Sequence, residues 1–131
     1  IRPWQHVLEP LSGYLRLAEA LASPRGATYA EAWNFGPADD DAQPVQWIVE
    51  RLLDRWGDSV GWVHDAAPQP HEAHYLKLDC SKARARLGWA PHWDLATALA
   101  SIVDWQRAAN AGSDLHATTL AQILAHRTAC A

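Results

Sequence analysis

The sequence predicts an α/β fold that is rich in helices and contains a few short strands. Several long stretches repeat apolar residues every three or four positions, which is the spacing of one face of a helix. Short aromatic or alternating stretches lie between them and are typical of strands. With 131 residues, the chain is one domain or part of one. Such short strands hardly make a stable sheet alone, so helices are expected to dominate.

The first two predicted helices are defined by their ends and their apolar positions. Residues 6–22 form the first helix, which Gly13 weakens slightly. The second begins at Pro44, after an acidic loop at residues 38–42, and ends at Gly57. The two apolar stripes consist of Val7, Leu8, Leu11, Leu15, Ala18 and Leu21, and of Val45, Ile48, Val49, Leu52, Leu53 and Trp56.

Three further helices follow from capping and stop signals. A short helix at residues 81–87 stops at Gly88. Asp94 caps a longer helix that ends near Gly112. Thr119 starts a capping box for a last helix that ends at about His126.

Three short strands are predicted at residues 32–37, 60–64 and 75–79. The first is rich in aromatic residues and is ended by a Gly-Pro pair. In the third, Leu76 and Leu78 share one face, and Tyr75, Lys77 and Asp79 share the other.

Composition excludes several classes of function. The net charge of −4 argues against a nucleic-acid-binding surface, which is usually basic. No apolar run approaches the roughly 18 residues of a membrane span. Cys80 and Cys130 are expected to be reduced thiols, as in a cytoplasmic protein. The chain has no Met and starts at Ile1, so we expect a piece of a longer protein.

Several catalytic motifs are missing from these residues. The sequence contains neither a glycine-rich dinucleotide motif nor a phosphate-binding P-loop. It has no Gly-x-Ser-x-Gly elbow, and no Tyr is followed four positions later by Lys. The cofactor-binding and catalytic groups that these motifs supply are therefore not expected within the 131 residues.

The densest cluster of functional side chains is His71, Glu72, His74 and Tyr75. Two histidines three positions apart can share a metal on a helix, but the preceding prolines and the following alternation favour a loop. Solvated or core histidines are a second interpretation. A third is an anion site, because imidazole and phenol groups donate hydrogen bonds to a diphosphate. Glu72 could then orient a histidine ring or accept from a sugar hydroxyl.

A second donor cluster opens the chain. Arg2, Gln5 and His6 lie at the start of a helix, where an anion is favoured, and Arg binds phosphate bidentately. An ordinary exposed arginine is the alternative. Trp4 is the best candidate for an aromatic residue in a site, since most of the other tryptophans are expected in the core. Asn34 could bind a nucleotide or cap a turn.

Three sequence blocks together resemble the CDP-glucose 4,6-dehydratases. They are residues 2–15 (RPWQHVLEPLSGYL), residues 33–37 (WNFGP) and residues 71–79 (HEAHYLKLD). A fourth block, residues 82–91 with Leu-Gly-Trp, is similar to the wider group of extended short-chain dehydrogenases. The resemblance covers nearly the whole chain. The first and third blocks are specific to the CDP-glucose branch, whereas the second and fourth also fit epimerases.

The resemblance implies a two-domain fold in which each domain binds a different ligand. Family members join a Rossmann domain that binds NAD to a smaller sugar-nucleotide domain, which residues 1–131 would form without the Rossmann half. The resemblance implies that Arg2 binds the diphosphate, that Asn34 contacts the nucleotide, and that His71, His74 and Tyr75 lie along the phosphate and sugar.

Partners and activity follow from the same resemblance. The full-length enzyme would convert CDP-glucose to CDP-4-keto-6-deoxyglucose with NAD, whereas this chain alone is expected to bind no cofactor and to be inactive. The missing Rossmann domain would leave an apolar surface, which favours a homodimer. Two alternatives are a free-standing binding module for a nucleotide or a protein, and a different enzyme of the group such as an epimerase.

Overall fold

The computed structural model describes residues 1–57, 61–65, 67 and 74–129. It is rich in helices and has one two-stranded sheet, in agreement with the predicted fold class. In chain order the elements are β1 (Arg2–Pro3), α1 (Leu8–Leu21), the 3₁₀ turns η1 (Gly26–Tyr29) and η2 (Asp39–Asp41), β2 (Ala42–Gln43), α2 (Val45–Trp56), α3 (Ser81–Leu87), α4 (Leu95–Asn110) and α5 (Leu115–Ala129).

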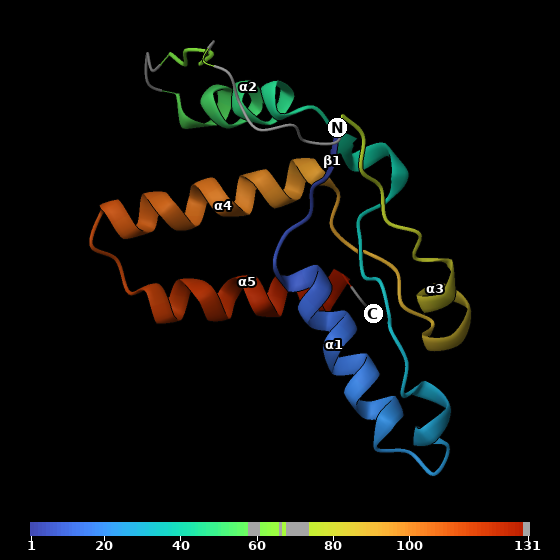
Figure 1. Cartoon of the computed structure of the whole chain (residues 1–131). Helices are drawn as coiled ribbons and strands as arrows, with labels where there is room; N and C mark the ends of the chain where they lie inside the picture. The colour runs from blue at the N-terminus through green and yellow to red at the C-terminus, as the bar shows by residue number, and fades with distance from the viewer. Residues whose placement is uncertain (58–60, 66, 68–73, 130–131) are drawn as a thin grey trace.

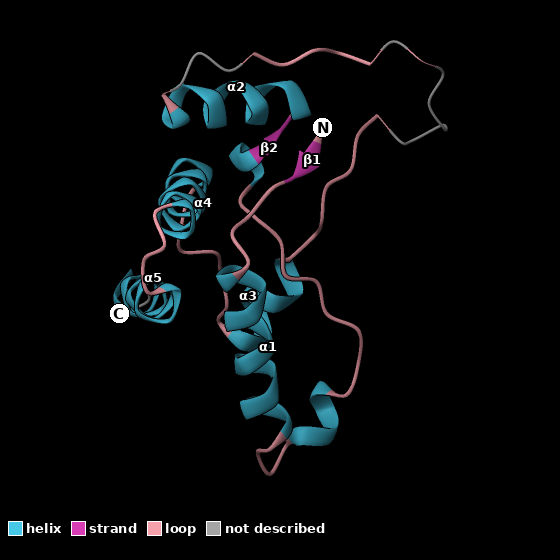
Figure 2. Ribbon diagram, turned by 90° about the vertical axis from the view of Figure 1, so that its left-hand side faces the viewer, coloured by secondary structure: helices cyan, strands magenta, loops and turns pink. Residues whose placement is uncertain are grey.

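The helices form two groups that meet near the start of α1. Helices α4 and α5 make an antiparallel hairpin, and α2 packs on the other side of α4 (Figure 1). Helix α1 packs against α3 and η1 and runs away from this stack (Figure 2). Among the described residues, no helix has the length and apolar character needed to cross a membrane.

Local signals in the sequence set most helix boundaries. Helix α2 follows Pro44 and ends at Gly57, whose φ of 78° is left-handed and suits glycine. Helix α3 ends at Gly88, with a φ of 63°. The Asp94 carboxylate accepts the Thr97 N–H at 2.8 Å and caps α4 as predicted.

The start of α5 differs from the prediction. The helix begins at Leu115, because the Asp114 carboxylate accepts the N–H groups of His116 and Ala117 at 2.9 and 3.1 Å. Thr119 therefore lies inside the helix instead of capping it. Its hydroxyl accepts a hydrogen bond from the Trp105 indole at 3.0 Å and joins α5 to α4.

The predicted strands are wrong in the described parts of residues 32–37, 61–64 and 75–79, where the structure assigns no strand. Residue 60 lies outside the described part of the chain. The only strand pair among the described residues joins β1 to β2, with Arg2 opposite Gln43. Alternating side chains are not sufficient for a strand, since the backbone also needs a neighbour to pair with.

Two apolar clusters form the core. Phe35, Cys80, Ala83, Leu87 and Trp89 make the first, between α1 and α3. The second consists of Ile48, Leu95 and Leu99, between α2 and α4. The buried thiol of Cys80 has a raised pKa, chiefly because burial disfavours the thiolate, and Cys130 lies outside the described residues.

The buried face of helix α1 is not the apolar stripe that the sequence analysis identified. Val7 and Leu15 are 61% and 69% exposed, whereas Glu9 and Gly13 are buried. Gly13 faces Phe35 so closely that a Cβ built on it would lie 2.3 Å from the ring. The narrow face lets the extended segment around Phe35 approach, and most of the apolar stripe remains on the surface.

Candidate functional site

Three extended segments that the sequence analysis singled out lie side by side. The α-amino group of Ile1 donates to the His74 carbonyl at 2.7 Å, and the Leu76 N–H donates back to the Ile1 carbonyl at 3.2 Å. Asn34 Nδ2 donates to the Asp79 carbonyl at 3.2 Å. The N-terminal, 33–37 and 74–79 segments are therefore joined by hydrogen bonds, although they are far apart in the sequence.

Arg2 directly follows Ile1, the residue that is hydrogen-bonded to the 74–76 backbone. It is held in β1, and its guanidinium donates to the Ile1 carbonyl at 2.9 Å. The same carbonyl also accepts the backbone N–H of Leu76. Arg2 is thus linked through Ile1 to the segment that carries His74 and Tyr75. His74 and Tyr75 are both exposed. Arg2, His74 and Tyr75 therefore lie on neighbouring segments and offer guanidinium, imidazole and phenol groups, which can donate hydrogen bonds to an anionic ligand.

Lys77 adds a second cation that the site prediction did not include. Its ammonium lies 5.7 Å from the centre of the Tyr75 ring and 3.5 Å from Asp39 Oδ1. Its pKa is raised, first by a hydrogen bond with Tyr75 and then by the Asp39 carboxylate. The alternation that places Tyr75 and Lys77 on one face was the signal for this residue.

The remaining predicted residues have separate outcomes. Asn34 is exposed, and its amide donates to the distant Asp79 carbonyl, which is neither of the two roles weighed in the sequence, nucleotide binding or capping of a turn. His71 and Glu72 lie outside the described residues. Arg2, Asn34, His74 and Tyr75 lie on the three joined segments.

Trp4, Gln5 and His6 do not form an exposed donor cluster with Arg2. The Trp4 indole donates to the Gln43 carbonyl at 2.9 Å, and its ring packs against the second core cluster. Gln5 Nε2 donates to the Phe35 carbonyl at 2.9 Å, and its buried Oε1 has no partner among the described residues.

His6 lies just before the first helix and is buried. Its Nδ1 accepts the Leu8 N–H at 3.3 Å, so the neutral ring carries its proton on Nε2. The pKa of His6 is lowered, first by burial and then by the neighbouring His126. A buried, neutral imidazole is poorly suited to contact a phosphate on the surface.

Comparison with known proteins identifies a close relative. The chain is 54% identical over 115 residues to a curated CDP-glucose 4,6-dehydratase of Salmonella typhimurium. The aligned region covers 88% of this chain but only 32% of that enzyme. The resemblance to the CDP-glucose 4,6-dehydratases is confirmed. No protein-family model matches the chain.

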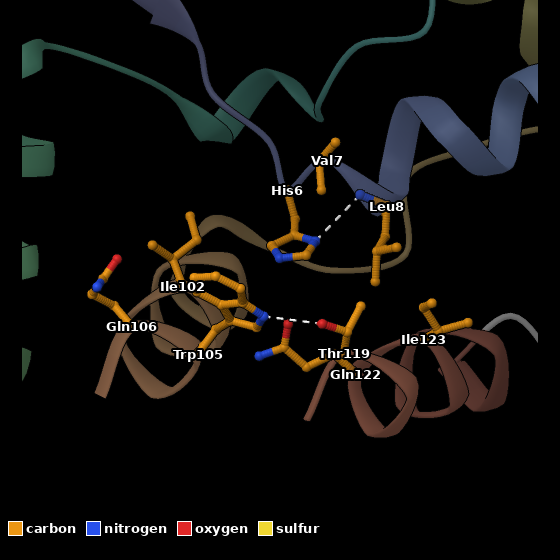
Figure 3. Close-up of a pocket in the computed structure, with 9 residues that line it drawn as sticks. All are labelled: His6, Val7, Leu8, Ile102, Trp105, Gln106, Thr119, Gln122 and Ile123. Carbon is orange, nitrogen blue, oxygen red and sulfur yellow. Dashed lines mark hydrogen bonds between the residues drawn. The ribbon is translucent and has the colours of Figure 1, made fainter. Parts of the chain in front are cut away.

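An apolar pocket near the start of α1 lies apart from the residues expected to bind a CDP-sugar. It is a cavity of about 250 Å³ between the beginning of α1 and helices α4 and α5 (Figure 3). Leu8, Ile102, Trp105 and Ile123 supply most of its apolar wall, and His6 lies at one side. Neither Arg2 nor the 74–79 segment is among the residues that line it.

Proposed function

We propose that this chain forms the CDP-sugar-binding part of a CDP-glucose 4,6-dehydratase. The 54% identity to the Salmonella enzyme is the observation that carries the proposal. The joining of the 1–6, 33–37 and 74–79 segments supports it, since these segments carry most of the residues that the resemblance assigns to the ligand.

The proposed contacts follow the charges of a nucleotide sugar. Arg2 binds the diphosphate, because a guanidinium matches phosphate oxygens bidentately. His71, His74 and Tyr75 donate to the phosphate and sugar end, and Glu72 orients a histidine ring or accepts from a sugar hydroxyl. Asn34 contacts the nucleotide. We add Lys77 to this set, because its ammonium lies against the Tyr75 ring.

Catalysis in the proposed enzyme requires groups that these residues do not contain. NAD, which the resemblance implies, supplies the hydride acceptor and donor for conversion of CDP-glucose to CDP-4-keto-6-deoxyglucose. The 131 residues have neither a glycine-rich dinucleotide motif nor a Tyr-x-x-x-Lys pair. We therefore propose that a Rossmann domain provides both and that the 131-residue chain alone is inactive.

A homodimer is part of the same proposal. The outward stripe of α1 presents apolar side chains to solvent, including Val7, Leu11 and Leu15. Contiguous apolar patches often mark interaction surfaces. Sedimentation should show a dimer that Leu15→Glu weakens, whereas Leu124→Glu on exposed α5 should not. A monomer at all concentrations would count against the dimer.

Calorimetric titration of the chain with CDP-glucose tests the binding site. Arg2→Gln should weaken binding roughly tenfold to hundredfold, because a charged hydrogen bond contributes about 1.5–3 kcal/mol. Arg25→Gln, in an exposed turn, is the matched control and should bind like the wild type. UDP-glucose should bind less tightly than CDP-glucose.

The other outcomes separate the competing functions. Equal affinity of the Arg2 and Arg25 variants would exclude the proposed diphosphate contact. A folded chain that does not bind CDP-glucose would favour the free-standing binding module. Turnover of CDP-glucose with NAD by the 131-residue chain would refute the proposed need for a Rossmann domain.

A further inference from the structure

A polar cluster lies inside the protein, away from the proposed CDP-sugar site. Glu9, in the first turn of α1, is fully buried. Its Oε1 lies 2.9 Å from Nε2 of His126 on α5, and its Oε2 lies 3.8 Å from Nδ1 of His92. The three residues come from separate parts of the chain and converge on one point.

The donor atoms have the composition and spacing of a metal site. One carboxylate oxygen and two imidazole nitrogens lie within 4.8 Å of one another. Two histidines and one glutamate are a ligand set that zinc uses with a fourth, open position. In the described chain the ion pairs of Glu9 involve only His92 and His126, so no lysine or arginine compensates its buried charge.

The surroundings hold the ligands in place and leave one side open. The carboxylate of Glu9 accepts the backbone N–H groups of His92 and Trp93 at 3.0 and 2.8 Å, which fixes its orientation. The Trp93 ring packs edge-on against His126. Such supporting contacts orient metal ligands in proteins.

Access is possible at His92. Its side chain is 28% exposed and lines a cavity of about 230 Å³ together with Ser12, Arg16, Gly88 and Trp89. A metal ion can enter from this side, and water can occupy a fourth coordination position there.

From this geometry we propose that Glu9, His92 and His126 bind a zinc ion. Ligand atoms lie about 2.0–2.2 Å from zinc. Binding therefore requires a small movement of the partly exposed His92 ring and replaces the His126–Glu9 hydrogen bond by two bonds to the ion. The ion neutralises the buried carboxylate. It also joins three parts of the chain: α1 through Glu9, α5 through His126, and the loop that precedes α4 through His92. This inference does not depend on the proposed sugar-nucleotide function.

Titration of the metal-free 131-residue chain with Zn²⁺ tests the site, with Co²⁺ absorption as a spectroscopic readout of tetrahedral binding. We expect one ion per chain and a concentration-dependent rise in Tm. His92→Asn should lower the affinity about tenfold or more, since even indirect partners of metal ligands contribute that much. His116→Asn, at an exposed position on α5, should bind like the wild type.

Three results would overturn the proposal. As a control, circular dichroism should show that each variant keeps its helix content, which is expected for His92 because its side chain is partly exposed. Failure of the folded wild-type chain to bind Zn²⁺ would exclude the site. Stoichiometric binding that survives His92→Asn would also exclude it, and loss of binding in His74→Asn instead would place the metal in the segment of the proposed sugar site.

Discussion

The residues around Glu9 and the 74–79 segment differ in burial and in the kind of contacts that they make. On one side, Glu9 is buried and contacts His92, Trp93 and His126 through side-chain and backbone atoms. On the other, the 74–79 segment is exposed and is joined to the N-terminus mainly by two backbone hydrogen bonds with Ile1.

The comparison separates stability from sugar-nucleotide binding. A buried carboxylate with several donors is costly to disrupt, because each abandoned partner loses its hydrogen bond without regaining water. Tyr75 and Lys77 are exposed, so substituting them removes few packing contacts. Their polar atoms remain accessible to a ligand. Substitutions in the first region should therefore change stability, and substitutions in the second should change binding.

The largest effect is expected for Glu9→Ala. The variant removes the acceptor of the His92 and Trp93 N–H groups and of His126, so unfolding should become easier by about 3–5 kcal/mol. Urea denaturation measures this loss. Glu19→Ala on the same helix is the control, because its ion pair with Arg16 is exposed and worth under about 1 kcal/mol. Similar losses in both variants would contradict the special role of Glu9.

The same region shows where sequence reasoning reached its limit. The caps at Asp94, Gly57 and Gly88 were predictable, because each depends on residues within one turn of the helix end. Glu9 was not predicted, because a charged residue beside an apolar stripe normally faces water. Its partners His92 and His126 lie 83 and 117 residues away in the sequence, so no local pattern predicts these contacts.

The candidate site was predictable in its segments but not in its contacts. The blocks around Arg2, Asn34 and Tyr75 stood out by composition, and the structure joins them. Trp4 and His6 were interpreted as site residues, but both turn inward. The local sequence cannot tell which side of an extended segment faces the core, since this depends on distant elements.

A second stability prediction tests the close approach of α1 to the Phe35 segment. Gly13→Ala places a Cβ against the Phe35 ring, and overpacking of this kind costs about 1–3 kcal/mol. Gly61→Ala is the matched control, because its Cβ would meet no atom within 4 Å. Thermal unfolding compares the two variants. An unchanged Tm for Gly13→Ala would show that the ring moves aside without cost.

A smaller, pH-dependent effect is expected at Asp94. Hydrogen bonds from Thr97 lower the pKa of Asp94, so the folded state prefers its carboxylate. Asp94→Ala should cost about 1 kcal/mol at pH 7, as for other helix caps. This stabilisation is complete above the ordinary carboxyl range and disappears as the pH falls through the lowered pKa of the folded state. The deficit of the variant should therefore shrink below about pH 4.

Denaturant curves at several pH values measure the Asp94 effect. Asp104→Ala, at an exposed position in the middle of α4, serves as the control and should cost little stability at pH 7. A deficit of Asp94→Ala that stays constant from pH 7 to pH 3 would mean that the Thr97 contact does not depend on the carboxylate charge.

The smallest stability effect, and the sharpest contrast with Glu9, is expected for Tyr75→Phe. The side chain is 56% exposed, so loss of the hydroxyl should change stability by less than about 0.5 kcal/mol. If Tyr75 donates to the CDP-sugar, affinity for CDP-glucose should fall about fivefold, since one hydrogen bond contributes about 1 kcal/mol. Tyr14→Phe on α1 matches it in exposure, at 58%, and should leave the affinity unchanged. Equal affinities would remove Tyr75 from the binding surface, whereas a large loss of stability would show that the 74–79 segment supports the fold after all.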